Sequence, residues 1–312
     1  MNIVILGCGK IAHRVALGIK YSNANLYGIA SRNKEKAKEF ANKYNIENIY
    51  NYEECVNDPN VDIIYIATAN PTHYDLIKYC LNHKKHVICE KPMLSTCKEI
   101  DEVFDLAKQN NCFLMEAHKT CFTPLQEQIL NRIHEIGKVL QVKAWYCDEF
   151  DPTHLSEWNV EPNMGGSFYD IGVYPLVFSN LYANSNIKFL KFNVTKHKEY
   201  DCDFDCTCEM RYENDVVATI QSSWSHKKEN KGIIIGSKGT IGIINFWKNT
   251  EAKIIINNKE EIIQVHQDSD FTGEINHAVD CISKGLLESP RMSKHASIQI
   301  STVLEEMKKA RG

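Results

Sequence analysis

The strongest constraint on the fold of this chain is a regular alternation of strand-like and helix-like segments over its first 120 residues. Apolar stretches typical of buried strands lie at Ile3–Leu6, Leu26–Ala30, Ile63–Ala67, His86–Cys89 and Cys112–Glu116. Segments with helical patterning lie between them, at Ile11–Lys20, Lys34–Tyr44, Thr72–Asn82 and Ser95–Asn110. Strands that alternate with helices build right-handed βαβ units. The sequence therefore predicts an α/β domain with a doubly wound parallel sheet in residues 1–120.

The pattern changes after residue 120, where strand-like segments begin to follow one another directly. From Ile187 to Val265 these segments are separated by turn residues, which is typical of an antiparallel sheet. The other expected elements are a helix at Leu125–Ile136, a strand at Val139–Tyr146, a polar loop at Asp148–Met164, an apolar helix after Gly165-Gly166, and helices at Phe271–Lys284 and Ser293–Arg311. We expect residues 121–312 to form an α+β domain with a mostly antiparallel, open sheet.

The composition is that of a soluble globular chain with enough apolar residues for two domains. Of its 312 residues, 43% are hydrophobic and 24% are charged. A net charge of −4 excludes a generic nucleic-acid binder and a basic tail for anionic membranes. No apolar run approaches the roughly 18 residues of a transmembrane helix. Because Met1–Gly7 lacks the basic region of a signal peptide, we expect a cytoplasmic protein.

The 12 cysteines are scattered along the chain rather than arranged in a disulfide framework. This distribution is typical of reduced thiols in the cytoplasm. One cluster, Cys202, Cys206 and Cys208, leaves open a thiol or metal function. It lacks the paired Cys-x-x-Cys knuckles of structural zinc, so we expect no metal site.

A glycine motif directly follows the first expected strand and opens the first helix. It has the form G-x-G-x-x-A and reads Gly7-Cys8-Gly9-Lys10-Ile11-Ala12. In a Rossmann domain the first glycine makes the tight turn, and the second lets a pyrophosphate approach the backbone. The small third residue allows close packing of helix on strand. The motif in this setting predicts dinucleotide binding, and the alternative is a purely structural turn.

The end of the second strand bears on the choice of dinucleotide. An NAD-selective site usually places an acidic residue there for the ribose hydroxyls, but no acid occurs between Gly28 and Lys34. Ser31 and Arg32 occupy the position, and Lys36 adds a positive charge one turn along. Because these groups suit a 2′-phosphate, we expect NADP to be preferred, with NAD still possible. The alternative for Arg32 is a solvated residue at a helix start, or a guanidinium stacked on adenine.

Glu90-Lys91-Pro92 follows the fourth expected strand at its carboxyl end, where open α/β sheets bind their ligands. A lysine there can hold a positive charge beside a reacting oxygen. The alternative is a surface lysine after a strand.

A second informative run spans Gly165–Pro175. If it is helical, Asp170 and Tyr174 share a face, and Tyr174 could donate a proton. Ser167-x-x-Asp170 is also a capping-box pattern, so the carboxylate could only cap the helix. Pro175 disfavours a regular helix at Tyr174, and we expect a bend there.

Taken together, these runs resemble the Gfo/Idh/MocA oxidoreductase family, in particular its dihydrodiol dehydrogenase and NADP-dependent sugar 1-dehydrogenase branch. The resemblance extends nearly end to end and includes Met115-Glu116-Ala117 and Ile244-Asn245-Phe246-Trp247. It implies that Lys91 and Tyr174 face the substrate beside the nicotinamide. For Asp170 two roles stay open, orienting this pair or only capping the helix. It also implies a homodimer through the second sheet, and often a cis peptide before Pro92. The residues that it assigns to the cofactor, beyond those above, are Thr68, Asn70, His73, Glu90 and Lys91.

The chain also departs from the branch at positions that border the substrate pocket in relatives. Lys119 and Cys121 replace a tryptophan and an arginine, Asn159 replaces an arginine after Trp158, and Ser167 replaces a glycine. We place Lys119 and Trp158 in the substrate pocket, and the substrate itself stays open.

The sequence thus predicts an NAD(P)-dependent oxidoreductase that moves a hydride between the nicotinamide and a carbinol or carbonyl carbon of a sugar or diol. A positive charge from Lys91 would favour the phenolate of Tyr174, whose ordinary pKa near 10 is high for a base at neutral pH. The alternative is a non-catalytic relative that binds the dinucleotide as a signal and passes its state to a partner.

Overall fold

The computed structural model describes residues 1–149 and 157–312. The chain forms two compact units: unit 1 comprises Met1–Lys119 and Asp268–Ile298, and unit 2 comprises Thr120–Gln267 and Gln299–Gly312. The predicted domains, 1–120 and 121–312, divide the chain at nearly the same place but assign Asp268–Ile298 to the second part. Of the predicted loop Asp148–Met164, residues 150–156 lie outside the described residues.

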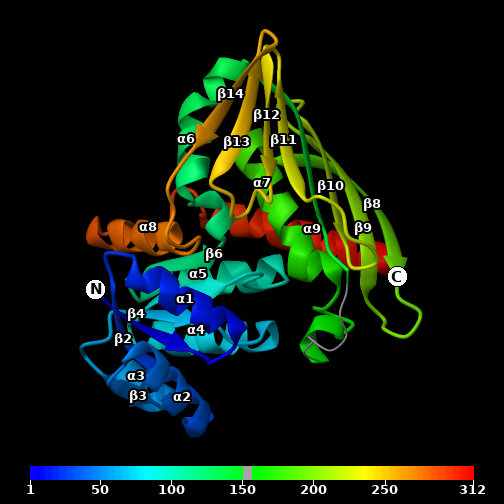
Figure 1. The fold of residues 1–312 in the computed structure, drawn as a ribbon. Helices are drawn as coiled ribbons and strands as arrows, with labels where there is room; N and C mark the ends of the chain where they lie inside the picture. The colour runs from blue at the N-terminus through cyan, green and yellow to red at the C-terminus, as the bar shows by residue number, and fades with distance from the viewer. Residues whose placement is uncertain (150–156) are drawn as a thin grey trace. The chain divides into compact units, whose positions relative to one another are not determined.

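Unit 1 is built on six parallel strands in the order β3-β2-β1-β4-β5-β6 (Figure 1). The strands are β1 (Asn2–Leu6), β2 (Asn25–Ala30), β3 (Asn48–Tyr50), β4 (Ile63–Ile66), β5 (His86–Glu90) and β6 (Leu114–Ala117). The central strands are buried along almost their whole lengths, because helices cover both faces of the sheet. This strand order is that of the doubly wound dinucleotide-binding sheet. The predicted α/β fold class is confirmed.

The helices of unit 1 account for the difference in domain boundaries. They are α1 (Lys10–Lys20), α2 (Lys34–Tyr44), α3 (Tyr52–Asn57), α4 (His73–Asn82), α5 (Cys97–Gln109) and α8 (Thr272–Ser283). Helix α8 packs on α1, and the Thr272 hydroxyl donates a 3.1 Å hydrogen bond to the Gly18 carbonyl. The Leu114 N–H of β6 donates to the Leu287 carbonyl at 3.0 Å. Asp268–Ile298 therefore returns to the first sheet.

Two elements of unit 1 were not predicted, namely β3 and α3. They have three and six residues, which is too short for a hydrophobic period to be recognised. The start of α3 does carry a local signal, since Asn51 and Glu54 form a capping box.

Unit 2 is built on eight strands in the order β14-β13-β12-β11-β7-β10-β9-β8. The strands are β7 (Val139–Cys147), β8 (Ile187–Lys196), β9 (Asp203–Tyr212), β10 (Val217–Ser223), β11 (Lys231–Gly236), β12 (Gly239–Ile244), β13 (Glu251–Ile256) and β14 (Lys259–Gln264). Only the central pair β7 and β10 is parallel, as the prediction of a mostly antiparallel sheet requires.

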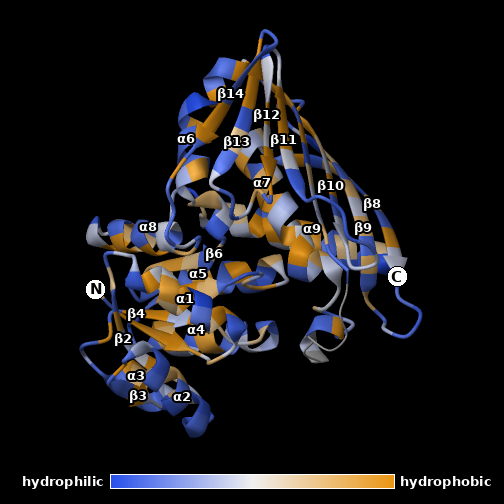
Figure 2. Cartoon of the chain, viewed as in Figure 1, coloured by the Kyte–Doolittle hydropathy of each residue, from blue (hydrophilic) through white to orange (hydrophobic). Residues whose placement is uncertain are grey.

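The sheet of unit 2 has one covered face. Buried and exposed side chains alternate along β9, and Figure 2 shows the corresponding change of hydropathy along the strands of this sheet. Helix α7 (Val173–Ala183) packs against β7, β10 and β11 on the buried face. The other helices are α6 (Pro124–Arg132), which a short 3₁₀ turn extends to Ile136, and α9 (Lys294–Arg311).

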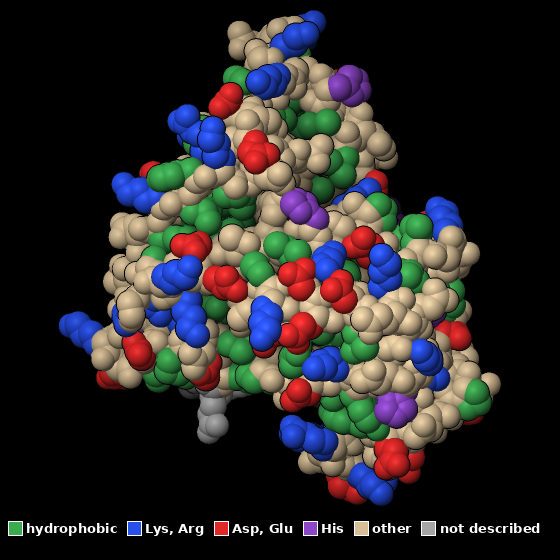
Figure 3. Space-filling model, turned by 180° about the vertical axis from the view of Figure 1, so that it is seen from behind, with side chains coloured by type: hydrophobic (Ala, Val, Ile, Leu, Met, Phe, Trp, Pro, Cys, Tyr) green, Lys and Arg blue, Asp and Glu red, His purple; other side chains and the backbone are tan. Residues whose placement is uncertain are grey.

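Acidic and basic side chains are interspersed over the face seen in Figure 3, consistent with the small net charge. Within the described part of the chain, no helix has both the length and the apolar character needed to cross a membrane.

Candidate active site

The glycine motif forms the turn between β1 and α1. Gly7 adopts a φ of +104°, where glycine is favoured, and a Cβ there would lie 2.7 Å from the Ala67 carbonyl oxygen. Gly9 has a φ of −76°, and among the described residues nothing lies within 4 Å of the position of its Cβ. Packing therefore does not explain a glycine at this position.

The start of α1 has the character of an anion site. Gly9 is the N-cap and has no side chain to bond the N–H groups of the first turn, which suits them to a phosphate. Lys10 is exposed and Ile11 is half-buried. Ala12 is fully buried, as the close packing of helix on sheet requires. This geometry fits the pyrophosphate of a dinucleotide.

The predicted residues at the end of β2 lie together with the glycine loop. Ser31 interacts with the Cys8 thiol, and Lys36 lies close enough to that thiol to lower its pKa. Burial outweighs both contacts and raises the pKa of Cys8. Arg32 is exposed and interacts with the Tyr52 phenol at the start of α3. Tyr52 belongs to an element that the sequence did not reveal.

His73 ties the loop after β4 to the segment after β5. Its Nδ1 lies 3.1 Å from the Met93 carbonyl oxygen, and its Nε2 lies 3.2 Å from that of Thr68. The ring is fully buried, and this burial lowers its pKa. Asn70, also buried, begins the 3₁₀ turn that lies between Thr68 and His73. His73 thus positions this loop, and both ring nitrogens face main-chain oxygens.

Lys91 lies directly after β5 and is half-buried. The Lys91–Pro92 peptide is cis, as the resemblance implied. The Lys91 N–H donates to the Glu90 carboxylate at 3.2 Å. Two residues further on, the Met93 N–H donates to Glu116 Oε1 at 3.0 Å. The backbone at Lys91 and at Met93 is therefore held by hydrogen bonds to two buried carboxylates, those of Glu90 and Glu116.

Glu116 is an ionised anchor inside unit 1. Its Oε1 lies 3.0 Å from His118 Nε2, and its Oε2 accepts a 2.7 Å hydrogen bond from the Ser297 hydroxyl. Burial alone would raise the pKa of this carboxyl. The attraction of His118 and the hydrogen bonds from His118, the Met93 N–H and Ser297 outweigh burial and lower it. Glu116 therefore holds the segment after Lys91 as an anion.

Lys119, a predicted substrate residue, is buried within unit 1. Its ammonium pairs with Asp270 and lies 4.8 Å from the centre of the Phe271 ring. Arg14 of α1 pairs with the same carboxylate at 2.5 Å. Burial lowers the pKa of Lys119 to about 8, against the attraction of Asp270. The structure therefore gives Lys119 a role in holding α8 near α1.

Asp170 and Tyr174 lie on consecutive helical segments of unit 2. Phe168–Gly172 is a π-helix that continues into α7. The predicted bend at Tyr174 is wrong: Tyr174 lies in regular α7, because Pro175 falls in the first turn of that helix, where proline is tolerated. The irregular turn is the π-helix that precedes it. The Tyr174 ring lies 5.8 Å from that of Tyr146 and 6.1 Å from that of Trp247.

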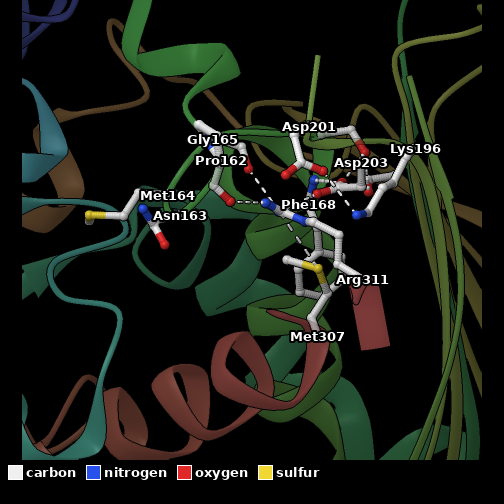
Figure 4. A network of polar contacts seen from close by, with 12 residues as sticks. Pro162, Asn163, Met164, Gly165, Phe168, Lys196, Asp201, Asp203, Met307 and Arg311 are labelled. Carbon is white, nitrogen blue, oxygen red and sulfur yellow. Dashed lines mark hydrogen bonds and ion pairs between the residues drawn. The ribbon is translucent and has the colours of Figure 1, made fainter. Parts of the chain in front are cut away.

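The start of the π-helix is held by a buried ion pair that the sequence did not reveal. Arg311 donates to the Gly165 carbonyl at 2.8 Å and to Asp203 Oδ1 at 2.5 Å (Figure 4). Asp203 Oδ2 accepts from the Phe168 N–H and the Ser167 hydroxyl, both at 2.8 Å. The serine of the capping-box pattern thus bonds Asp203 rather than capping the helix.

Gly166 allows the Asp203 carboxylate to lie close to the backbone before the π-helix. It has a φ of +106°, and a Cβ there would lie 2.2 Å from Asp203 Oδ1. Trp158, the other predicted substrate residue, is half-buried in a 3₁₀ turn of unit 2 that begins at Glu157.

The cysteine cluster is packed as apolar side chains are. Cys206 and Cys208 lie on the buried face of β9, and burial raises the pKa of Cys208 to about 12. All 12 cysteines lie in the described residues and none forms a disulfide. In the same residues, no group of three or more metal-ligating side chains comes together.

Sequence reasoning missed the residues that act through long-range contacts. These are Tyr52, Glu116, Asp203 and Arg311. Glu116 carried a usable signal, because it lies within the otherwise apolar strand β6, and a buried acid there needs a partner.

A parallel sheet of this strand order, with an anion-binding glycine loop after its first strand, defines a dinucleotide-binding protein. Residues 1–118 match the family model described as "Oxidoreductase family, NAD-binding Rossmann fold", and residues 130–242 match the "GFO/IDH/MocA C-terminal domain". The chain belongs to the Gfo/Idh/MocA family of oxidoreductases.

Relatives extend over the whole chain. It is 33% identical to the trans-1,2-dihydrobenzene-1,2-diol dehydrogenase of Xenopus laevis, over 97% of this chain and 95% of that protein. Among solved structures, the aldose-aldose oxidoreductase of Caulobacter crescentus, complexed with glycerol, is 20% identical, with a TM-score of 0.90 over 100% of this chain and 97% of that one. A 3-ketoreductase of Actinomadura kijaniata, KijD10, complexed with TDP-benzene and NADP, is 21% identical, with a TM-score of 0.84 over 98% and 96%.

The predicted family and fold are confirmed, and the chain is an NAD(P)-binding oxidoreductase. The roles of its individual residues follow below as proposals.

Proposed function

We propose that this enzyme transfers a hydride between the nicotinamide and a carbinol or carbonyl carbon of a small polyhydroxylated substrate, a sugar or a diol. The observation that carries the proposal is the presence of Lys91 after β5 and Tyr174 in the first turn of α7, in a chain similar end to end to diol dehydrogenases. When bound, the dinucleotide accepts or supplies the hydride. The protein supplies orientation, charge and a proton acceptor.

Tyr174 is the proposed proton-transfer group. In the oxidation direction its phenolate accepts the hydroxyl proton of the substrate, and in reduction the phenol returns it. Lys91 contributes an ammonium that favours the phenolate. We assign Asp170 to orienting the pair, since Ser167 bonds Asp203 and the capping-box alternative loses its serine.

The glycine loop is the proposed pyrophosphate site, through Gly7, Gly9 and the first turn of α1, where Lys10 and Ile11 lie. Thr68 and Asn70 are proposed to contact the cofactor from the loop after β4. Glu90 and His73 support this region through the backbone, because their side chains bond main-chain groups.

A substrate panel tests the activity. Sugars and diols are incubated with the enzyme and either NADP or NAD, and nicotinamide absorbance is followed. We expect turnover of at least one polyhydroxylated substrate. Tight dinucleotide binding with no turnover across the panel would instead favour the non-catalytic sensing protein.

We further propose that NADP is preferred over NAD. Support comes from the absence of an acid at the end of β2 and from the cluster of Ser31, Arg32 and Lys36, in which Tyr52 steadies the guanidinium. Charge-assisted hydrogen bonds contribute about 1.5–3 kcal/mol, so one contact gives a preference of roughly ten- to a hundredfold.

Arg32→Ala tests this preference through kcat/KM with each cofactor. We expect the substitution to lower kcat/KM for NADP by at least about tenfold and to spare NAD. Lys38→Ala is the matched control, because it removes a positive charge of α2 that already pairs with Glu35. Equal losses with both cofactors would show that Arg32 does not read the phosphate.

We also propose a homodimer through the open face of the second sheet. Alternate residues of β11 and β13 leave Ile233, Ile235 and Ile255 half-buried on the face opposite α7, and Ile262 of β14 is 45% exposed. A row of isoleucines on one sheet face suits a self-complementary contact. Light scattering at micromolar concentration should give twice the mass of the chain, whereas a stable monomer would refute the dimer.

A cytoplasmic location is proposed on the 12 cysteines, none of which is in a disulfide. Cell fractionation tests it.

A further inference from the structure

Three buried side chains of unit 1 meet around a single hydroxyl group. They are Tyr65 of β4, Glu90 of β5 and Glu274 of α8. The Tyr65 oxygen lies 2.8 Å from Glu90 Oε1 and 2.9 Å from Glu274 Oε1. Tyr65 and Glu274 are fully buried, and Glu90 is 8% exposed.

Counting hydrogens shows that this cluster needs one more proton than three ordinary side chains would carry. A phenol has one hydrogen to donate, and an ionised carboxylate can only accept. If both glutamates were ionised, one of the two contacts would bring lone pairs together at hydrogen-bond distance. A buried group in that state is costly. One carboxyl group must therefore carry a proton.

The surroundings distinguish the two carboxyl groups. Glu90 Oε2 accepts the Lys91 N–H, a contact that suits an anion. Glu274 Oε2 is buried and has no hydrogen-bond partner among the described residues. An anion with one unpartnered oxygen is the less stable choice, so the proton belongs on Glu274.

The charged groups that face Glu274 come from several elements. Glu90 and Tyr65 lie on the sheet, and Lys119 and Asp270 lie close enough to act on Glu274 through their charges. Arg14 of α1 forms an ion pair with Asp270. Burial, followed by the repulsion of Glu90, raises the pKa of Glu274 well above its ordinary value, against the contact with Tyr65 and the attraction of Lys119.

We propose that Glu274 is held as a neutral carboxylic acid that donates to the Tyr65 hydroxyl, which in turn donates to ionised Glu90, so that Glu274 is a positioning residue for the Lys91 segment. Its benefit to turnover rests on the proposed function, because that function places Lys91 at the substrate. The protonation state itself does not depend on that function.

Infrared spectroscopy of the native enzyme tests the protonation state directly. At pH 8 exposed carboxyl groups are ionised, so a carbonyl stretch of a protonated carboxyl group must come from a buried one. We expect this band in the wild type and in Glu116→Gln, and its loss in Glu274→Gln. Glu116 is the matched control, because it is equally buried but paired with His118.

Two results would overturn the assignment: no such band in the wild type at pH 8, or a band that disappears in Glu90→Gln and persists in Glu274→Gln. Absence of the band from the wild-type spectrum is decisive by itself if a variant does not fold. The measurement also needs no turnover, so its outcome is independent of the proposed hydride transfer.

The pH profile of kcat/KM tests the positioning role. Ionisation of Glu274 at alkaline pH would place two anions on one hydroxyl, and we expect activity to fall with it. Glu274→Gln cannot ionise and keeps a donor for Tyr65, so its alkaline fall should be displaced from that of the wild type. Glu274→Ala keeps no donor, and we expect its kcat to lie below that of Glu274→Gln throughout. Identical profiles for the wild type and Glu274→Gln would refute the role.

Discussion

Each unit holds a proposed catalytic residue on a segment that a buried carboxylate anchors, but the two carboxylates have different partners. In unit 1, Glu116 accepts from the Met93 N–H, two residues after Lys91, and pairs with His118. In unit 2, Asp203 accepts from the Phe168 N–H at the start of the segment that leads to Tyr174. Its partner is Arg311.

The difference concerns what happens when a partner is lost. A histidine can release its proton and remain buried as a neutral ring, whereas a guanidinium stays charged. Arg311 also donates to the carbonyls of Pro162 and Gly165, so its charge is tied to the shape of the loop before the π-helix (Figure 4). We therefore expect the anchor of unit 2 to be the more sensitive to loss of its carboxylate.

Asp203→Asn should have the largest effect. It leaves the Arg311 charge buried without a carboxylate, and breaking a buried pair in this way costs about 3–5 kcal/mol. The midpoint of urea unfolding measures the change. Asp201→Asn is the control, since Asp201 is exposed and pairs with Lys196 instead. Equal stability of the two variants would show that the buried pair does not anchor the segment.

Glu116→Gln should cost less, about 1–3 kcal/mol, which is the range for leaving buried hydrogen-bonding groups poorly matched. An imidazole, unlike a guanidinium, is not obliged to carry a charge, so the substitution does not leave an obligatory buried cation. The same urea measurement applies, with the exposed Glu39→Gln as control. A loss of stability as large as that of Asp203→Asn would contradict the expected difference between the histidine and arginine partners.

Lowering the pH should produce the smallest effect on stability, and one specific to Glu116. The pKa of Glu116 is lowered in the folded state, whereas in the unfolded chain it has the ordinary value of about 4.3. Between these two pKa values, Glu116 binds a proton more readily in the unfolded chain than in the folded one. The contribution of Glu116 to stability is thus complete above the unfolded-state pKa and is lost as the pH falls through the folded-state pKa. Urea midpoints from pH 6 to pH 3 should show the wild type and Glu116→Gln converging. A constant difference would exclude Glu116 as the titrating group.

The two sheets could be predicted because their patterns are local. The strands of unit 1 are continuous apolar runs between helices, and those of unit 2 alternate along the chain. The anchors could not be predicted, because their partners lie far away along the chain. Glu116 bonds Ser297, 181 residues away, and Asp203 pairs with Arg311, 108 residues away. Nothing in the local sequence selects such partners. The return of α8 to unit 1 was missed for the same reason.

The motif residues show the same limit. Gly7 and Gly9 could be predicted from spacing alone, and the structure gives each a separate reason. The resemblance places Lys119 beside the substrate pocket, which stays a prediction, and nothing in the sequence indicated its partner Asp270, which lies 151 residues away.

The central claim is that Lys91 and Tyr174 carry out proton transfer for one hydride-transfer reaction. The most direct measurement is kcat on the best substrate of the panel for Tyr174→Phe and Lys91→Met, with cofactor affinity determined by fluorescence titration in the same samples. We expect each variant to lose at least about a hundredfold in kcat, the scale of general acid–base catalysis, while cofactor binding is retained. A Tyr174→Phe enzyme that turns over at the wild-type rate would contradict the account.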